Sequence, residues 1–357
     1  MKARKTPNGK WRVDFREEGK GRTRVFKTQA QANAFIAELQ HSKNQGTWIN
    51  SRSRRIPVGE FLERYMQDRR HNLAASSRYS YEQYLKNRIK PRWEHVSVGE
   101  VTRRDVQDWV NDLADELAPK TVRTIHGIFS GALKLAVLEN CLSNNPCNGV
   151  QLPKVQRGDK VYMSLEQLEM LIEEANGDKK LLIRLQATTG MRFGEVAGLQ
   201  VGDIDFERHR ISIKRQAVTV GNAVHVKEAL KTEGSRRVIA FSSKLDEELK
   251  KLCKGKKKTD FLFTKKGTQE PLKRPEGPKS WLGCAVARIR AVDDDFPHVT
   301  SHDLRHTAVS LMVSVGAPIS VISRQVGHKN ISMTLDHYTE LFDSDLDALT
   351  TAMDSIL

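Results

Sequence analysis

The sequence lacks the features typical of secreted, membrane-bound and metal-dependent proteins. It has four cysteines in 357 residues, and they form neither a Cys-x-x-Cys pair nor a Cys/His spacing typical of zinc. It has no apolar run long enough to cross a bilayer, and its basic N-terminus is not followed by the apolar stretch of a signal peptide. These absences predict a cytoplasmic protein with reduced thiols, no metal site and no membrane partner. The cysteines are Cys141, Cys147, Cys253 and Cys284.

Acidic residues are also too few to balance the basic ones. The chain has 44 Asp and Glu against 59 Lys and Arg, which gives a net charge of +15. Residues 1–55 alone hold 14 Lys and Arg against 4 Asp and Glu. This segment predicts a polyanionic partner such as nucleic acid, although an ordinary basic protein could have the same total charge. Because 38% of the residues are hydrophobic, we expect two or three domains with true cores.

Residues 1–50 have the pattern of a small β-sheet followed by a helix. Apolar and polar residues alternate over 11–16 and again over 22–27, with a turn between them. Thr28 and Gln31 have the spacing of a capping box, which predicts the start of a helix. We expect arginines on one face of the sheet and the helix behind the other, so that the arginine face can meet a DNA groove. An RNA-binding or purely structural module is the alternative. The predicted DNA-binding residues are Arg12, Arg16, Arg22 and Arg24.

A basic linker at 51–55 precedes a segment with helical spacing. Apolar residues recur every three or four positions over four stretches, residues 61–66, 79–85, 106–113 and 122–133. They predict a helical domain of four or five helices at 57–150. Its basic side chains could line a DNA-facing side, whereas a solvated bundle surface is the ordinary environment of any single lysine. The predicted DNA-binding residues in this domain are Lys120 and Arg123.

The remaining residues, 160–357, are predicted to form a third domain with a C-terminal tail. Ser164 and Gln167 mark the start of a helix, and a mostly helical pattern continues to the C-terminus except for a β segment near 210–243. The predicted fold class is therefore multidomain and mainly α with small β segments. It combines a β-sheet-plus-helix module, a helical domain and a mixed α/β domain that is mostly α.

The third domain carries polar residues whose chemistry combines in a fixed order. Arginines can bind the non-bridging oxygens of a phosphodiester, histidines and a lysine can move protons, and a tyrosine can attack phosphorus. Glu195 lies three residues after Arg192 and can hold its guanidinium. Each residue alone has an ordinary alternative, such as a surface ion pair, a solvated lysine or a buried tyrosine. The residues are Arg192, Glu195, Lys231, His302, Arg305, His328 and Tyr338.

Taken together, these segments resemble the tyrosine recombinases of the phage integrase family. The matching segments are Thr-Gly-Met-Arg-x-x-Glu at 189–195, Lys-Thr-x-x-Ser-Arg-Arg at 231–237, His-Asp-Leu-Arg-His-Thr at 302–307, Gly-His at 327–328 and Thr-Leu-Asp-x-Tyr at 334–338. The resemblance covers residues 57–357 in organisation and 160–345 in detail. The N-terminal module is similar to the arm-site-binding domains of lambda-like integrases.

The resemblance implies a site-specific DNA recombinase, an integrase of a phage, prophage or other mobile element. Tyr338 would be the nucleophile, and a 3′-phosphotyrosine would conserve the bond energy, so no cofactor is expected. Arg192 and Arg305 would bind the scissile phosphate, with His328 as a further donor. Lys231 would be the general acid and His302 an acid/base.

The implied partner is double-stranded DNA carrying attachment sites, bound by a homotetramer in the cytoplasm of a bacterial host. Lambda-like relatives often also use an accessory DNA-bending protein and a directionality factor. Three other functions are possible. The first is a non-catalytic DNA-binding regulator, which would not need Tyr338, and the second is a type IB-like topoisomerase, which relaxes DNA without exchanging partners. The third is a recombinase that resolves chromosome dimers, and the basic N-terminal module argues against it.

Overall fold

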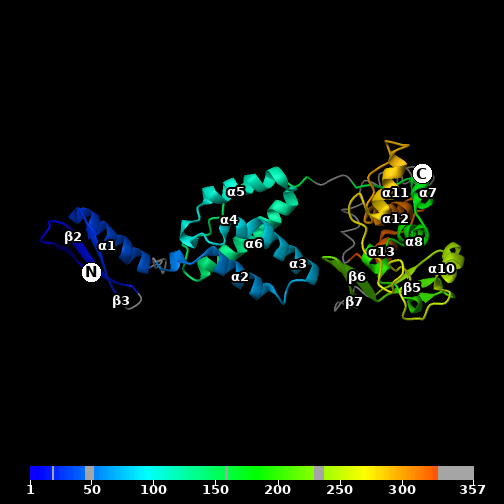
Figure 1. The fold of residues 1–357 in the computed structure, drawn as a ribbon, viewed down its shortest axis with the longest axis horizontal. Helices are drawn as coiled ribbons and strands as arrows, with labels where there is room; N and C mark the ends of the chain where they lie inside the picture. The colour runs from blue at the N-terminus through cyan, green and yellow to red at the C-terminus, as the bar shows by residue number, and fades with distance from the viewer. Residues whose placement is uncertain (18–19, 45–51, 157–159, 229–236, 329–357) are drawn as a thin grey trace, which may run out of the picture. The chain divides into compact units, whose positions relative to one another are not determined.

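The computed structural model describes residues 1–17, 20–44, 52–156, 160–228 and 237–328. The chain forms two compact units, residues 1–157 and residues 158–357 (Figure 1). In the described ranges, no helix combines the length and the apolar character needed to cross a membrane. The predicted fold class, multidomain and mainly α with small β segments, is confirmed.

The first unit begins with a three-stranded antiparallel sheet and one helix. The strands lie in the order β1, β2, β3, and helix α1 starts after Thr28, whose hydroxyl accepts a hydrogen bond from the Gln31 backbone N–H at 3.2 Å. Phe35, Ile36 and Leu39 of α1 pack against Val13 of the sheet in a small core of their own. The bounds are β1 Ala3–Lys5, β2 Trp11–Glu17, β3 Lys20–Phe26 and α1 Gln29–Asn44.

The register of this sheet overturns one prediction about its faces. Glu17 pairs with Lys20, so every even-numbered residue of β2 lies opposite an odd-numbered residue of β3. Directly opposed residues share a face, and therefore Arg24 lies on the face of Val13, the side covered by α1. Arg12 lies on the other face, opposite Val25. The expectation that the arginines of both strands share one face is therefore wrong.

The two sets of arginines have different neighbours. The guanidinium carbon of Arg24 lies 5.0 Å from the ring centroid of Phe35, so its charge stacks on the aromatic core. Arg22, opposite Phe15, is on the same side. Arg12 instead donates from Nε to the carboxylate of Asp14 at 2.7 Å on the open face. Arg16 lies four positions after Arg12 on β2 and therefore belongs to the same face of the sheet. Its side chain lies outside the described part.

The helical domain follows in the same unit. Its core centres on three aromatic rings: Trp93 stacks on Phe129 with centroids 4.9 Å apart, and Trp109 meets Trp93 edge-on at 5.7 Å. Thr102 and Asp105 form a reciprocal capping box at the start of α5, and Pro119 opens α6. The elements are α2 Val58–Arg69, α3 Ala75–Tyr84, the π-helical η2 Leu85–Ile89, α4 Lys90–Trp93, α5 Arg103–Glu116 and α6 Pro119–Leu138.

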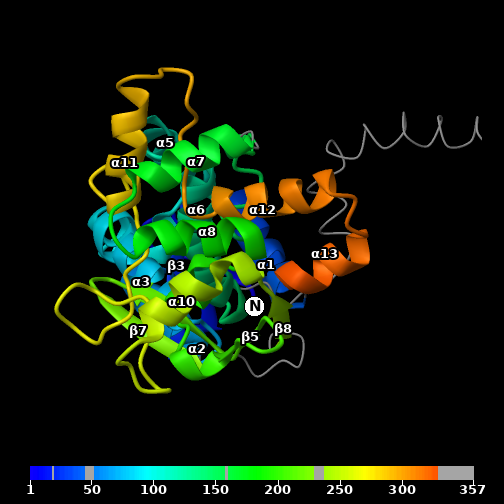
Figure 2. The same cartoon turned by 90° about the vertical axis from the view of Figure 1, so that its right-hand side faces the viewer.

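The second unit places helices on one side and small sheets on the other. Figures 1 and 2 show α7, α8, α11 and α12 together, with the strands and α10 across from them. The helices are α7 Leu165–Glu174, α8 Lys179–Thr189, α9 Phe193–Ala197, α10 Asp246–Cys253, α11 Trp281–Arg290, α12 Asp303–Ser314 and α13 Ile319–Val326. The strands are β4 Ile204–Asp205, β5 Arg210–Ile213, β6 Arg215–Val220, β7 Ala223–Glu228 and β8 Arg237–Ala240. They form the sheets β4-β5-β8 and β6-β7.

Helix α13 is fixed between the helical side and the β side. It packs on α12 through Val309, Val313, Ile322 and Val326. Its Gln325 side chain extends the hydrogen bonding of β8, accepting from the Ala240 N–H at 3.0 Å and donating to the Ala240 carbonyl at 2.7 Å. The C-terminal end of α13 is consequently held at the junction of helices and sheet.

Candidate active site

Four of the six predicted catalytic residues lie in the described part of the chain, and they gather around the end of α13. Arg192 precedes α9, His302 and Arg305 lie at the start of α12, and His328 follows α13. Lys231 and Tyr338 lie outside the described residues. Segments up to 135 positions apart in the sequence therefore meet at one place.

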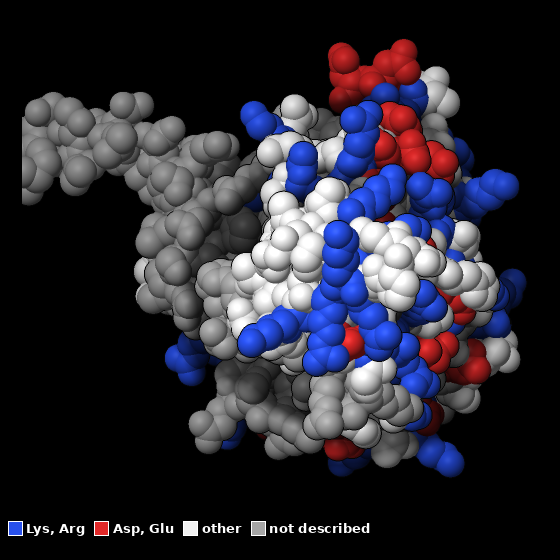
Figure 3. Space-filling view, turned by 90° about the vertical axis from the view of Figure 1, so that its left-hand side faces the viewer, with Lys and Arg blue, Asp and Glu red and all other residues white. Residues whose placement is uncertain are grey.

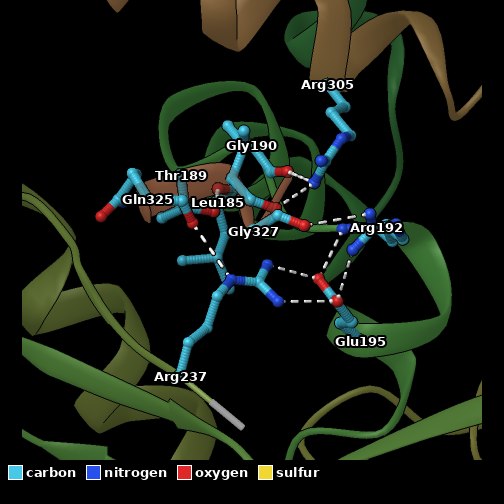
Figure 4. Close-up of polar contacts among 10 residues, drawn as sticks. Leu185, Thr189, Gly190, Arg192, Glu195, Arg237, Arg305, Gln325 and Gly327 are labelled. Carbon is cyan, nitrogen blue, oxygen red and sulfur yellow. Dashed lines mark hydrogen bonds and ion pairs between the residues drawn. The ribbon is translucent and has the colours of Figure 1, made fainter. Parts of the chain in front are cut away.

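Three successive carbonyl groups at the end of α13 each accept a hydrogen bond from a different arginine (Figure 4). Arg237 Nε donates to the Gln325 carbonyl at 3.2 Å, and Arg305 Nη1 donates to the Val326 carbonyl at 2.7 Å. Arg192 Nη2 donates to the Gly327 carbonyl at 3.3 Å. The last carbonyls of a helix have no partner inside it and form its negative end, so they are natural acceptors for cations.

Two glycines allow this close packing. Gly190 ends α8 with φ +70°, its carbonyl accepts from Arg305 Nη1 at 2.6 Å, and an added Cβ would lie 2.6 Å from Val326 Cγ1. Gly327 ends α13 with φ +75°, and an added Cβ would lie 2.8 Å from the Arg237 guanidinium carbon. Both positions favour glycine because of their positive φ and because the neighbouring atoms leave no room.

Glu195 is the carboxylate that joins two of these arginines. It lies at the third position of α9, where it accepts from the Arg192 backbone N–H at 2.9 Å and from Arg192 Nη1 at 3.1 Å. It also accepts from both Nη atoms of Arg237, at 2.9 and 2.8 Å. Arg192 is thus the residue before the helix rather than part of it, and Glu195 holds both its backbone and its side chain.

The arginines differ in exposure. The side chain of Arg192 is 43% exposed, whereas Arg305 is 2% exposed as a residue. A phosphate oxygen could approach the open edge of Arg192 from solvent. Arg305 is held from within by the ends of α8 and α13. Together they place two planar donors of fixed orientation at one site, as anchoring of a phosphodiester requires.

His302 stands at the rim of this cationic site. Partial loss of solvent around the ring lowers the pKa of His302 below its ordinary 6.5, and Arg305, Arg274 and Arg192 lower this pKa further, against the opposing charge of Asp303. The residue nevertheless remains exposed to solvent. Its ring meets that of His306 edge-on, with centroids 4.8 Å apart. The neutral imidazole is therefore favoured at neutral pH, and it can accept a proton.

His328 lines a basic cavity of about 710 Å³ beside the end of α13. Its backbone N–H donates to the Ser323 carbonyl at 3.1 Å. The walls include Lys214, Arg237 and Arg324, with Glu228 as the acidic member. This cavity can take an anionic group. Within the described ranges, no group of three or more His, Cys, Asp or Glu side chains is arranged to hold a metal ion.

Arg237 had no predicted role, yet the structure places it at the centre of the polar network. The sequence held a signal for the burial of Arg237, because residues two positions apart on a strand lie on the same face. Arg237 therefore shares a face with Ile239. In the structure Ile239 is 1% exposed and Val238 is 56% exposed, so this shared face is the buried one. The motif at 231–237 ends in two adjacent arginines, Arg236 and Arg237. Only the alternation of the strand indicates that Arg237 is the one on the buried face.

The predicted basic residues of the helical domain, Lys120 and Arg123, both lie exposed on α6. Arg123 Nε donates to the Pro153 carbonyl at 2.9 Å, which ties α6 to the segment that leads into the second unit. The charge of Arg123 remains accessible from solvent.

Two sections of the chain match known families. Residues 162–345 match the phage integrase family, and residues 58–114 match the N-terminal SAM-like domain of phage integrases. The ICEBs1 integrase of Bacillus subtilis (strain 168) is 24% identical over 377 residues, covering all of both chains.

Solved structures share the fold. The Tn1549 transposon integrase in complex with a circular intermediate DNA matches with a TM-score of 0.68 and 21% identity, over 82% of this chain and 99% of the other. A lambda integrase tetramer bound to a Holliday junction matches with a TM-score of 0.56 and 15% identity, over 92% of this chain and 95% of the other. The likeness covers both the helical domain and the unit that holds the candidate site.

Proposed function

Because this chain belongs to the phage integrase family, we infer that it is a site-specific DNA recombinase of a mobile element, a tyrosine recombinase that breaks and rejoins DNA. The observation that carries this conclusion is the family match over residues 162–345, which spans the described cluster of Arg192, Arg305 and His328. The cluster offers cationic donors to one phosphodiester and requires no further group to do so.

The chemistry we propose for the site begins with attack of the Tyr338 hydroxyl oxygen on the scissile phosphorus. The new O–P bond forms as the bond from phosphorus to the 5′ oxygen breaks, which leaves a 3′-phosphotyrosine and a free 5′-hydroxyl. Lys231 gives the proton to the leaving oxygen, and neutral His302 takes the phenolic proton. Attack by a second 5′-hydroxyl reverses the step and joins a new partner.

Arg192 and Arg305 stabilise the charge that develops on the non-bridging oxygens, and His328 donates a further hydrogen bond. Their fixed orientation supports this assignment, because donors already in place need not reorganise in the transition state. Removal of such a donor is expected to slow cleavage by about 10²–10³. Glu195 supports the reaction by holding Arg192.

We also propose three domains: an arm-type DNA-binding module at 1–50, a core-binding domain at 57–150 and a catalytic domain at 160–357. Separate hydrophobic cores in the module and in the helical domain support the division. Arg12 on the open face of the sheet is the best-placed DNA contact of the module, with Arg16 next in its alternation. Figure 3 shows many Lys and Arg side chains on the face it draws, interspersed with Asp and Glu and with uncharged residues. Lys120 and Arg123 are the proposed contacts of the core-binding domain.

The partner is double-stranded DNA, and a tetramer on DNA is the proposed active assembly. The lambda integrase tetramer bound to a Holliday junction supports it through the shared fold. We further propose action in the cytoplasm of a bacterial host, with an accessory DNA-bending protein and a directionality factor as additional partners.

Covalent trapping tests the chemistry. Wild type and Tyr338→Phe are incubated with a nicked suicide substrate built from DNA that flanks the gene, and the products are separated on a denaturing gel. A shifted protein–DNA band with wild type alone is the expected result, and Tyr79→Phe, at a 39% exposed position of the helical domain, should keep the band. An equal band with Tyr338→Phe would place the nucleophile elsewhere. A plasmid with paired sites then separates strand exchange from mere relaxation by a topoisomerase.

A further inference from the structure

Arg237 joins Glu195 to the C-terminal end of α13. Its side chain is 8% exposed and forms a two-pronged ion pair with Glu195, whose side chain is 7% exposed. Its remaining nitrogen, Nε, donates to the Gln325 carbonyl at 3.2 Å. All three guanidinium nitrogens are therefore bound to protein, so Arg237 has little capacity left for a DNA phosphate.

The ion pair controls how strongly Glu195 attracts Arg192. Burial by itself would raise the pKa of the Glu195 carboxyl, but hydrogen bonds and charge from Arg237, then the charge of Arg192, lower this pKa overall. Without Arg237, the buried carboxylate would have Arg192 as its only close cation among the contacts described. It would then either take up a proton or draw Arg192 away from the substrate.

Arg237 also supports the backbone that leads to His328. Its guanidinium packs against Gly327, where even a methyl group would come within 2.8 Å, and it binds the carbonyl two residues before Gly327. A substitution of Arg237 is consequently expected to shift the Gly327 carbonyl, which accepts a hydrogen bond from Arg192, and the neighbouring residue His328.

Arg237 also lies close in the chain to the proposed general acid. It is the first residue of β8, six positions after Lys231. Through its contacts with Glu195 and α13, Arg237 therefore also holds the start of β8.

We propose that Arg237 is a positioning residue for strand cleavage: it neutralises one side of Glu195, so that Arg192 stays oriented toward the scissile phosphate and His328 keeps its place. This role rests on the proposed function, because it acts through Arg192. Arg237 does not itself touch the substrate.

The test measures the rate of covalent complex formation in single-turnover reactions with the nicked DNA at saturation, beside DNA affinity and thermal unfolding. Arg237→Gln should slow the covalent step by about 10²-fold, a loss that a displacement of a catalytic group by about 1 Å can cause. The affinity for DNA should change little, and Arg237→Lys should recover part of the rate.

Arg288→Gln is the matched control. Arg288 also joins two helices: its Nε and Nη2 donate to the side-chain carboxylate and the backbone carbonyl of Glu174, both at 2.7 Å. Its hydrogen bonds within the described residues do not involve Glu195 or α13. It should keep the wild-type rate. An Arg237→Gln variant that folds and cleaves at the wild-type rate would overturn the proposal.

A double-mutant cycle separates positioning from general stability. Because Arg237 acts mainly by holding Arg192 through Glu195, the rate loss of Arg192→Gln combined with Arg237→Gln should be clearly smaller than the product of the two single losses, with only the part transmitted through His328 remaining. Fully additive losses would contradict the proposal even if both single variants are slow. Absence of any covalent product from wild type across the flanking sequences would instead count against the proposed function, which keeps the two failures apart.

Discussion

His302 shows how single side chains are tuned before any ligand is bound. Its pKa is lowered by partial desolvation and then by three arginines, one of which, Arg274, is exposed and outside the main hydrogen-bond network. A neutral His302 at pH 7 fits a residue that must accept a proton. Because the phosphate of bound DNA would counter these cations, the effect belongs to the free protein.

We therefore expect His302 in the DNA-free protein to titrate below 6.5, and Arg274→Ala to raise its pKa. An NMR titration of the imidazole ring signals measures both values. Lys273→Ala removes the positive charge next to Arg274 in the chain, which is not among the main causes of the shift, and it should leave the titration nearly unchanged. No change with Arg274→Ala would show that this arginine does not act on His302.

His126 makes a second prediction at this scale. It is 9% exposed in α6, and its Nε2 has no hydrogen-bond partner within the described structure. Burial lowers its pKa below 6.5, with Arg123 adding to this effect and a hydrogen bond with the Cys147 backbone opposing it. The unfolded chain therefore binds a proton at His126 more readily than the folded chain does. The stability that depends on a neutral His126 is fully present above pH 6.5, and it is lost as the pH falls through the folded-state pKa of His126.

The free energy of unfolding of the helical domain should thus decrease between pH 7.5 and pH 5.5 less steeply in His126→Gln than in wild type, as measured by denaturant unfolding. The exposed His95 of the same domain provides the control, since His95→Gln should keep the wild-type slope. Equal slopes in all three proteins would mean that His126 does not contribute.

At the scale of elements, spacing predicted which segments are helices and strands better than which way they face. The helices of the domain at 57–150 and the strands near 210–243 lie where the periodicity placed them. The faces of the N-terminal sheet were predicted wrongly, because a face depends on which residues are paired across the turn. A shift of one residue in the pairing of two strands moves every side chain of one strand to the other face of the sheet. The alternation of apolar and polar residues within each strand does not determine which of the two registers forms.

The register gives Arg12 and Arg24 opposite consequences. Arg24→Ala should destabilise the N-terminal module by about 0.5–1 kcal/mol, because it removes a cation stacked on Phe26 and Phe35. Arg12→Ala should leave stability nearly unchanged and weaken binding to duplex DNA, reducing the slope of log affinity against log salt by about 1. Thermal unfolding and salt-dependent binding assays measure these effects. The reverse pattern would mean that the α1 side of the sheet meets the DNA.

At the scale of the whole molecule, the charge and the candidate chemistry lie in different parts of the chain. Residues 1–55 carry ten of the fifteen net positive charges, and the module has its own core. A protein lacking residues 1–55 should therefore cleave core-site DNA at close to the wild-type rate but integrate poorly. Suicide-substrate cleavage and a plasmid integration assay would be compared. Equal loss of both activities would overturn the assignment of an arm-binding role to this module.

The sequence could predict the identities at the site but not its assembly. The order of Arg192, His302, Arg305 and His328 was readable along the chain. Their meeting around the last carbonyls of α13 was not, because it depends on contacts across 21 to 135 positions. The part played by Arg237 was hidden for the same reason: its partner Glu195 lies 42 positions away.

The carbonyls at the end of α13 have a kinetic consequence. Guanidinium groups brought together in a partly buried place repel one another by several kcal/mol, which would normally keep them apart until an anion arrived. Here the helix end and Glu195 already supply the negative partners. The arginine cluster can therefore exist before the encounter with DNA, and its formation need not add a waiting time between binding and strand cleavage.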